Sequence, residues 1–182
     1  MKGINHLYSG IVAGTTLACL HYNGFTDSII FLSMVSIGSI IPDIDSSKSF
    51  VGRYSRPVSV LVEHILGHRR LLHSPLMVLL LIICCSITIP FSLWIGLIIG
   101  YLLHLFLDMH TARGIPLFYP IKNTCYTMSG KRSGKKGEFF RMIYLSGLFC
   151  LFLEVVGIVS MQKCSFTSVA FATIKSIISR RF

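Results

Sequence analysis

Long apolar runs separated by short polar connections are the dominant pattern along this chain. The runs cover residues 7–20, 28–41, 75–107, 139–159 and, more weakly, 165–179. The run over 75–107 breaks at Pro90 and so predicts two closely spaced segments, and the run over 139–159 is long enough for one span. The first two runs have about fourteen residues each and fit short spans, a re-entrant hairpin or buried helices. The pattern predicts an all-α, polytopic helical membrane protein with about four to six membrane-associated helices.

Composition supports a membrane protein of one domain. The chain has 182 residues, of which 53% are apolar, and its mean hydropathy of +0.71 lies outside the range of soluble globular proteins. We expect a single domain over residues 1–182, with a core of motifs in 2–120, a basic loop in 121–138 and C-terminal helices in 139–182. The first run lacks a small-residue cleavage pattern, so we do not expect a signal peptide.

The distribution of positive charge predicts the orientation. Of the 17 Lys and Arg residues, five lie in 46–74 and seven in 109–141, whereas the connections at 21–27, 89–91 and 160–164 hold Lys163 alone. Positive residues in short loops stay on the cytoplasmic side, so both termini and both basic loops are expected there. We therefore predict a multi-pass protein of the cytoplasmic (inner) membrane.

In this topology, ionisable side chains from scattered parts of the chain fall at one membrane level. They begin or end the predicted segments on the cytoplasmic side and are His6, Asp43, Asp45, His73, His104 and Asp108. Carboxylates and imidazoles are costly near hydrocarbon unless they are paired or coordinate a cation. Their convergence predicts a metal site at the cytoplasmic interface, which is also the active-site face.

Each motif has a simpler interpretation when it is taken alone. His104 and Asp108 are one helical turn apart, which suits two ligands of one cation, but such residues also serve as core or capping groups. Asp43 and Asp45 follow Pro42, where they could converge on a cation or end a helix in solvent. The agreement of separate clusters favours metal binding over these alternatives.

The donor types narrow the choice of metal. Imidazole with carboxylate suits zinc, manganese or iron better than calcium or magnesium, which favour all-oxygen shells. Zinc is our first choice. The six cysteines lack the spacing of a thiolate cluster.

The motifs also carry a resemblance to a known family. They are Ile41-Pro42-Asp43-Ile44-Asp45, Gly67-His68-Arg69 with His73-Ser74, Gly100-Tyr101 with His104 and Asp108, and Gly114-Ile115-Pro116-Leu117 with Pro120. In this order they resemble the YdjM family of membrane-bound, metal-dependent hydrolases, and His6 is similar to an N-terminal histidine of that family. The resemblance implies a more distant kinship with zinc-dependent phospholipase C and P1 nuclease, which cut phosphoesters. Ser46 and Leu72 depart from the family pattern, and His110 could compensate for a histidine missing at position 46.

Together with the predicted metal site, the resemblance implies hydrolysis of a phosphoester in a membrane-associated or lipid substrate. A metal would activate water and polarise a phosphoryl or acyl oxygen. Arg69 and Arg70 would neutralise the phosphate or merely set the topology, and either His68 or His73 would act as a general acid. One alternative is a metal-independent lipid phosphatase with a histidine nucleophile, although the chain lacks a Pro-Ser-Gly-His element. The other is a non-enzymatic metal or proton carrier.

A basic run over residues 129–137 indicates a further partner. Its four Lys and Arg residues lack the order of a nucleotide-binding loop, and beside a bilayer they bind anionic lipid headgroups. The net charge of +10 fits that partner. No nucleic acid is expected, because aromatic interleaving is absent and the topology accounts for the basic residues.

Overall fold

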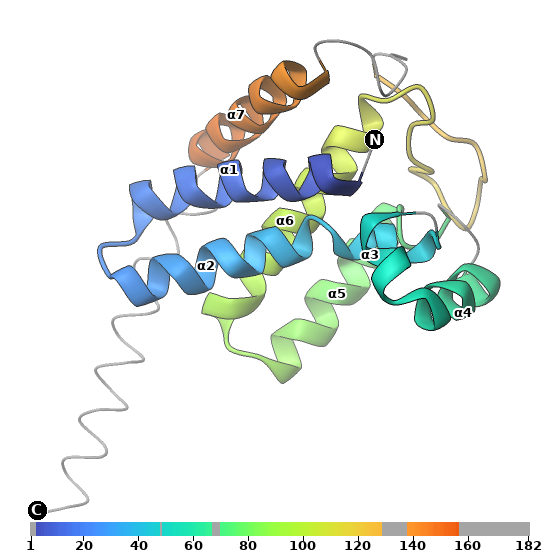
Figure 1. Cartoon of the computed structure of the whole chain (residues 1–182), viewed down its shortest axis with the longest axis horizontal. Helices are drawn as coiled ribbons and strands as arrows, with labels where there is room; N and C mark the ends of the chain where they lie inside the picture. The colour runs from blue at the N-terminus through green and yellow to red at the C-terminus, as the bar shows by residue number, and fades with distance from the viewer. Residues whose placement is uncertain (1–2, 48, 67–69, 129–137, 157–182) are drawn as a thin grey trace, which may run out of the picture.

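The computed structural model describes residues 3–47, 49–66, 70–128 and 138–156, and this part of the chain is helical (Figure 1). The long helices are α1 (Gly3–His21), α2 (Phe25–Gly38), α5 (Pro75–Thr88), α6 (Phe91–Met109) and α7 (Glu138–Val156), and the short ones are η1 (Ile41–Asp45), α3 (Phe50–Tyr54) and α4 (Arg56–Leu66). Extended pairing within these ranges is limited to an antiparallel bridge between Ile115 and Tyr126. The predicted all-α class is confirmed.

Proline residues set both ends of the α5 region. Ile89 is extended (φ −134°, ψ 152°) and ends α5, and α6 begins after Pro90. Ser74 is extended in the same way before Pro75, the first residue of α5. A residue before proline is driven out of the helical region, whereas proline itself fits the first helical turn. The predicted break at Pro90 is therefore confirmed.

The segment between η1 and α5 was expected to be a basic loop, but part of it is helical. α3 begins after Ser49, whose hydroxyl accepts a hydrogen bond from the Gly52 amide at 2.8 Å. α4 follows Ser55 and packs against η1, where the Ser59 hydroxyl donates to the Ile44 carbonyl at 2.7 Å. α3 is too short to produce an apolar run, and α4 mixes polar with apolar residues, which is why the hydropathy pattern missed them.

Glycine allows α2 and α6 to pack with their backbones in contact. A Cβ atom at Gly100 would lie 2.0 Å from the Val35 carbonyl oxygen, and one at Gly38 would lie 2.1 Å from the Leu97 carbonyl oxygen. Side chains are therefore excluded at both positions, as at other close helix contacts. The close packing brings the end of α2 against the half of α6 that carries two of the predicted metal ligands.

α7 packs along α1 and is exposed on its outer side. Near the start of α7, Phe139 packs edge-on to Tyr8 with ring centroids 6.5 Å apart. At the far end of both helices the His21 ring and the Glu154 carboxylate form a hydrogen bond. The outer side exposes large apolar side chains, among them Phe140, Leu151, Phe152 and Val155. An apolar outer surface of this kind suits contact with lipid.

Two stretches of the described chain are long and apolar enough to cross a membrane, Phe25–Asp45 and Glu138–Val156. Pro75–Thr88 and Leu93–Met109 are apolar but shorter. The prediction of a multi-pass protein with four to six membrane-associated helices thus goes beyond these two stretches and stays a prediction. The weak apolar run over 165–179 lies outside the described residues.

Candidate metal centre

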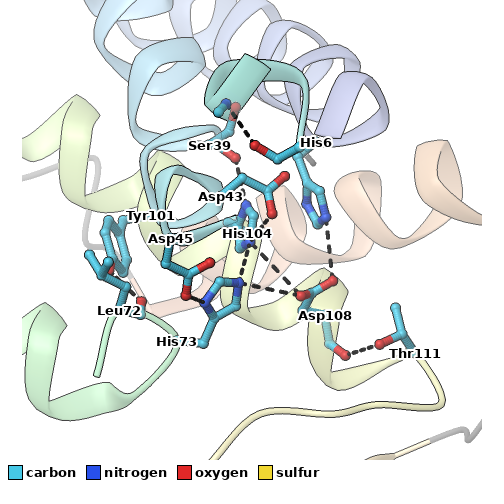
Figure 2. Close-up of polar contacts among 12 residues, drawn as sticks. His6, Ser39, Asp43, Asp45, Leu72, His73, Tyr101, His104, Asp108 and Thr111 are labelled. Carbon is cyan, nitrogen blue, oxygen red and sulfur yellow. Dashed lines mark hydrogen bonds and ion pairs between the residues drawn. The ribbon is translucent and has the colours of Figure 1, made fainter. Parts of the chain in front are cut away.

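The six predicted ligands lie together around the ends of α2 and α6 (Figure 2). They come from four parts of the chain: the start of α1, the turn η1, the residue before the α5 cap, and α6. All six are buried, with exposed fractions of 5% or less: His6, Asp43, Asp45, His73, His104 and Asp108. Segments up to a hundred residues apart thus contribute to one buried polar cluster.

His104 and Asp108 occupy successive turns on one face of α6, as their spacing predicted. Nε2 of His104 lies 3.9 Å from Oδ2 of Asp108. On the other side of the ring, Nδ1 of His104 donates to the carbonyl oxygen of Ser39, the residue that ends α2, at 2.7 Å. A carbonyl oxygen can only accept, so Nδ1 carries the proton and Nε2 of the neutral ring keeps its lone pair.

His73 is oriented in the same manner by Asp45. Its Nδ1 lies 3.0 Å from Oδ2 of Asp45, and its Nε2 points toward His104 (Figure 2). The turn that carries His73 is held from α6, because the Tyr101 hydroxyl donates to the Leu72 carbonyl. The Asp45 carboxylate can only accept, so Nδ1–H of His73 donates the hydrogen bond and the Nε2 lone pair of the ring stays available.

Three acceptor atoms therefore face one another. The Nε2 atoms of His73 and His104 are 3.3 Å apart, and they lie 3.6 Å and 3.9 Å from Oδ2 of Asp108. Without a proton or a cation among them, these lone pairs repel one another in a buried environment. Donors at the usual 2.0–2.1 Å from a tetrahedral zinc ion are about 3.4 Å apart, so the observed spacing fits three ligands of one ion.

His6 and Asp43 extend the cluster. The His6 ring stacks on the His104 ring with centroids 3.9 Å apart, and its Nε2 lies 3.3 Å from Oδ1 of Asp108. Oδ1 of Asp43 is 4.0 Å from Nε2 of His104. Nδ1 of His6 and Oδ2 of Asp43 are buried without a hydrogen-bond partner in the described part of the chain. Such atoms are costly unless an ion or a water satisfies them.

Two overlapping groups of side chains could therefore hold a metal ion. One is His6, Asp43 and His104, and the other is His73, His104 and Asp108. Within each group the ligand atoms all lie within 4.8 Å of one another. Asp45 belongs to neither group and meets the opposite side of the His73 ring.

The other predicted residues for which the structure gives a position, Arg70 and His110, belong to neither group. Arg70 is exposed, three residues before His73, and His68 and Arg69 lie outside the described residues. His110 follows the end of α6, where its Nδ1 donates to a carbonyl of the last helical turn at 2.9 Å. His110 is in neither metal-binding group, and the idea that it compensates for a histidine at position 46 stays a prediction.

Sequence reasoning missed two of the groups that hold the histidines in place, Ser39 and Tyr101. Ser39 acts through its backbone carbonyl, which its side chain does not reveal, and Tyr101 contacts a residue far away in the sequence. One signal was available. Gly96 and Gly100 are four residues apart in an apolar segment, which is typical of close helix packing, and that packing sets the distance between Ser39 and His104.

The fold and the site define a class of protein: helical, with stretches able to cross a membrane and with a buried His and Asp cluster that could hold a metal ion. The chain belongs to the family described as YdjM inner membrane protein, whose model matches residues 1–179. The family resemblance carried by the sequence motifs is thereby confirmed.

The relatives of the chain are bacterial proteins. It is 33% identical over 153 residues to the uncharacterized protein YvsG of Bacillus subtilis (strain 168), which covers 81% of this chain and 89% of YvsG. It is 35% identical over 89 residues to the inner membrane protein YdjM of Escherichia coli (strain K12), which covers 46% of this chain and 45% of YdjM. The match to YdjM thus spans less than half of that protein. No solved structure matches the chain.

Proposed function

We propose that this protein is a metal-dependent hydrolase of the inner (cytoplasmic) membrane that cleaves a phosphoester in a membrane-associated or lipid substrate. The observation that carries the proposal is the convergence of buried acceptor atoms from His73, His104 and Asp108 at 3.3–3.9 Å. The membrane location is supported by the family description and by the two stretches long enough to cross a bilayer.

The metal would be held by His73, His104 and Asp108, with His6 and Asp43 as further donors. When bound, a divalent metal supplies a Lewis acid that activates water and polarises a phosphoryl or acyl oxygen. The mixture of imidazole and carboxylate suits zinc best, with manganese and iron as alternatives. The buried nitrogen of His6 and the buried oxygen of Asp43 that have no partner among the described residues support a cation in their vicinity.

Two hydrogen-bond acceptors that are not themselves metal ligands would hold His73 and His104 in the tautomer that can bind the metal through Nε2. The Ser39 carbonyl accepts a hydrogen bond from Nδ1–H of His104, and the Asp45 carboxylate accepts one from Nδ1–H of His73. Partners of this kind fix the orientation of a metal-binding ring and raise its basicity. Asp45, which the sequence suggested as a ligand, is therefore assigned a positioning role.

Substrate binding would involve the basic residues that precede His73. Arg70 is exposed, so its guanidinium can meet a phosphate at the surface, and its planar fork suits two phosphate oxygens. Arg69 would assist. Both ring nitrogens of His73 have other roles in this scheme, so His68 is the candidate for the general acid.

The complete burial of the cluster favours a second candidate function. Exposed fractions of 0–5% for the six side chains suit a protein that binds a metal without turning over a substrate. Such a carrier or structural metal protein would retain metal and show no hydrolysis. Activity and metal content must therefore be measured on the same preparation.

The test is release of phosphate or headgroup from mixed micelles of anionic phospholipid, with and without a chelator. Our proposal predicts release that stops on chelation and returns when zinc, manganese or iron is added. Bound metal without release would favour the second candidate. Release that survives chelation would favour the metal-independent phosphatase with a histidine nucleophile.

A further inference from the structure

The inner side of α4 is attached to the turn that carries the two aspartates. Buried Ser59 donates to the Ile44 carbonyl of η1 at 2.7 Å, and the Glu63 carboxylate accepts from the Ser47 amide at 3.2 Å. The two side chains are four residues apart and lie on one face of the helix. α4 therefore moves with η1 and supports one wall of the candidate metal centre.

The outer side of α4 is apolar and exposed. Val58, Val60 and Leu61 are 50%, 50% and 59% exposed, and Tyr54, at the end of α3, is 86% exposed. Exposed His64 shares this side near the end of the helix. A helix that is polar toward its own protein and apolar toward the outside has the amphipathic pattern that calls for an apolar partner.

The contact with η1 also sets the level of α4 relative to a membrane. Ile44, the acceptor for Ser59, is the last residue but one of Phe25–Asp45, a stretch long enough to span a bilayer. The end of a span lies at the boundary between hydrocarbon and headgroups. α4 would lie at the same boundary, where exposed tyrosine side chains such as Tyr54 are typical.

Basic side chains accompany the apolar side. Arg53 in α3 and Arg56 at the start of α4 are exposed, and Arg70 is exposed beyond the end of α4. An interfacial helix buries its apolar face at the edge of the acyl chains and keeps basic residues near the lipid phosphates. The charges and the apolar side of α4 thus fit the same partner.

We propose that α4 is an interfacial membrane helix that binds the lipid surface through Val58, Val60 and Leu61 and holds η1 at the membrane boundary. This inference rests on the membrane location proposed above and identifies the surface by which the metal centre meets the bilayer. A substrate embedded in that leaflet would then reach the centre without leaving the membrane.

Fluorescence of a single tryptophan tests this contact. Trp94 is the one tryptophan of the chain, so the double variant Trp94→Phe and Leu61→Trp carries its fluorophore on the outer side of α4. The full chain is reconstituted into vesicles of phosphatidylcholine and phosphatidylglycerol, brominated near the headgroup ends of the acyl chains. We expect blue-shifted emission that loses most of its intensity in brominated vesicles and resists aqueous iodide. The control, Arg113→Trp in the same background, replaces an exposed side chain and should be quenched by iodide instead.

Two results would overturn the proposal. Quenching of Leu61→Trp by iodide alone would mean that α4 faces water, and protection from both quenchers would mean that protein covers it, either a second copy or residues 157–182. Val58→Trp repeats the measurement if Leu61→Trp does not fold. Metal content of the same vesicles separates this inference from the proposed function, because quenching by brominated lipid without bound metal would overturn only the latter.

Discussion

At the residue scale, the candidate centre depends on which ring nitrogen each histidine keeps available. Ser39 and Asp45 both accept from Nδ1, so the two Nε2 atoms face each other and Asp108. The sequence could suggest the ligand candidates because ionisable groups next to apolar runs are costly and need a reason. The sequence could not assign their roles, because Asp43 and Asp45 look alike in it. In the structure Asp43 lies near Nε2 of His104, whereas Asp45 meets Nδ1 of His73.

Replacing Asp45 with Asn should weaken metal binding without abolishing it. The amide can donate to Nδ1 of His73 and so favour the tautomer that carries its proton on Nε2. A protonated Nε2 has no lone pair with which to bind the metal. We expect the metal affinity to fall about 10- to 100-fold, as measured by competition with a chromophoric chelator. Asp108→Asn, the matched variant, removes a proposed donor and should lose the metal entirely. Equal losses in the two variants would instead identify Asp45 as a ligand.

Arg70→Lys should reduce hydrolysis far less than Asp108→Asn does. Lysine keeps the positive charge and loses only the planar fork, which is worth about 1–3 kcal/mol, or roughly tenfold to a hundredfold in rate. The measurement is headgroup or phosphate release, with metal content determined in parallel. Arg70→Lys should retain its metal. Full activity in Asp108→Asn would contradict the role of Asp108 as a metal ligand in catalysis.

At the scale of elements, the close packing of α2 on α6 determines whether the ligands meet. The hydropathy pattern predicted the apolar helices and the break at Pro90, because long runs and proline act locally. It missed α3 and α4, whose short lengths and polar contacts with η1 depend on tertiary structure. It also missed the contact at Gly100, where α6 touches the backbone of α2.

Gly100→Ala should destabilise the protein and weaken its metal binding together. The added Cβ would lie 2.0 Å from the Val35 carbonyl oxygen, so α6 must move away from α2, which costs about 1–3 kcal/mol. The same movement would separate His104 from Ser39. Thermal unfolding in detergent should show a lower Tm, and chelator competition a lower affinity.

The matched control for that variant is Gly147→Ala in α7. A Cβ atom at Gly147 meets nothing within 4 Å, so the metal affinity should stay at its original value and the Tm should stay or rise slightly, because alanine favours a helix over glycine. Equal changes of the Tm and the metal affinity in the two variants would show that the contact at Gly100 does not hold the metal centre together.

At the scale of the whole molecule, the orientation in the membrane is a prediction from charge. Reporters fused after Ser55, between α3 and α4, and after Pro90, between α5 and α6, should lie on opposite sides, with Ser55 in the cytoplasm. A fluorescent protein that folds only in the cytoplasm and a phosphatase that is active only outside provide the two readouts. Both positions on one side would contradict the predicted topology and with it the cytoplasmic active-site face.

The most direct test of the central claim is elemental analysis of the protein purified from membranes in mild detergent without chelator. The account predicts at least about one equivalent of a divalent metal per chain, with zinc favoured. The double variant His73→Ala and His104→Ala should insert into the membrane and lack that metal. A folded protein that retains no metal, and binds none on titration with zinc, manganese or iron, would contradict the account.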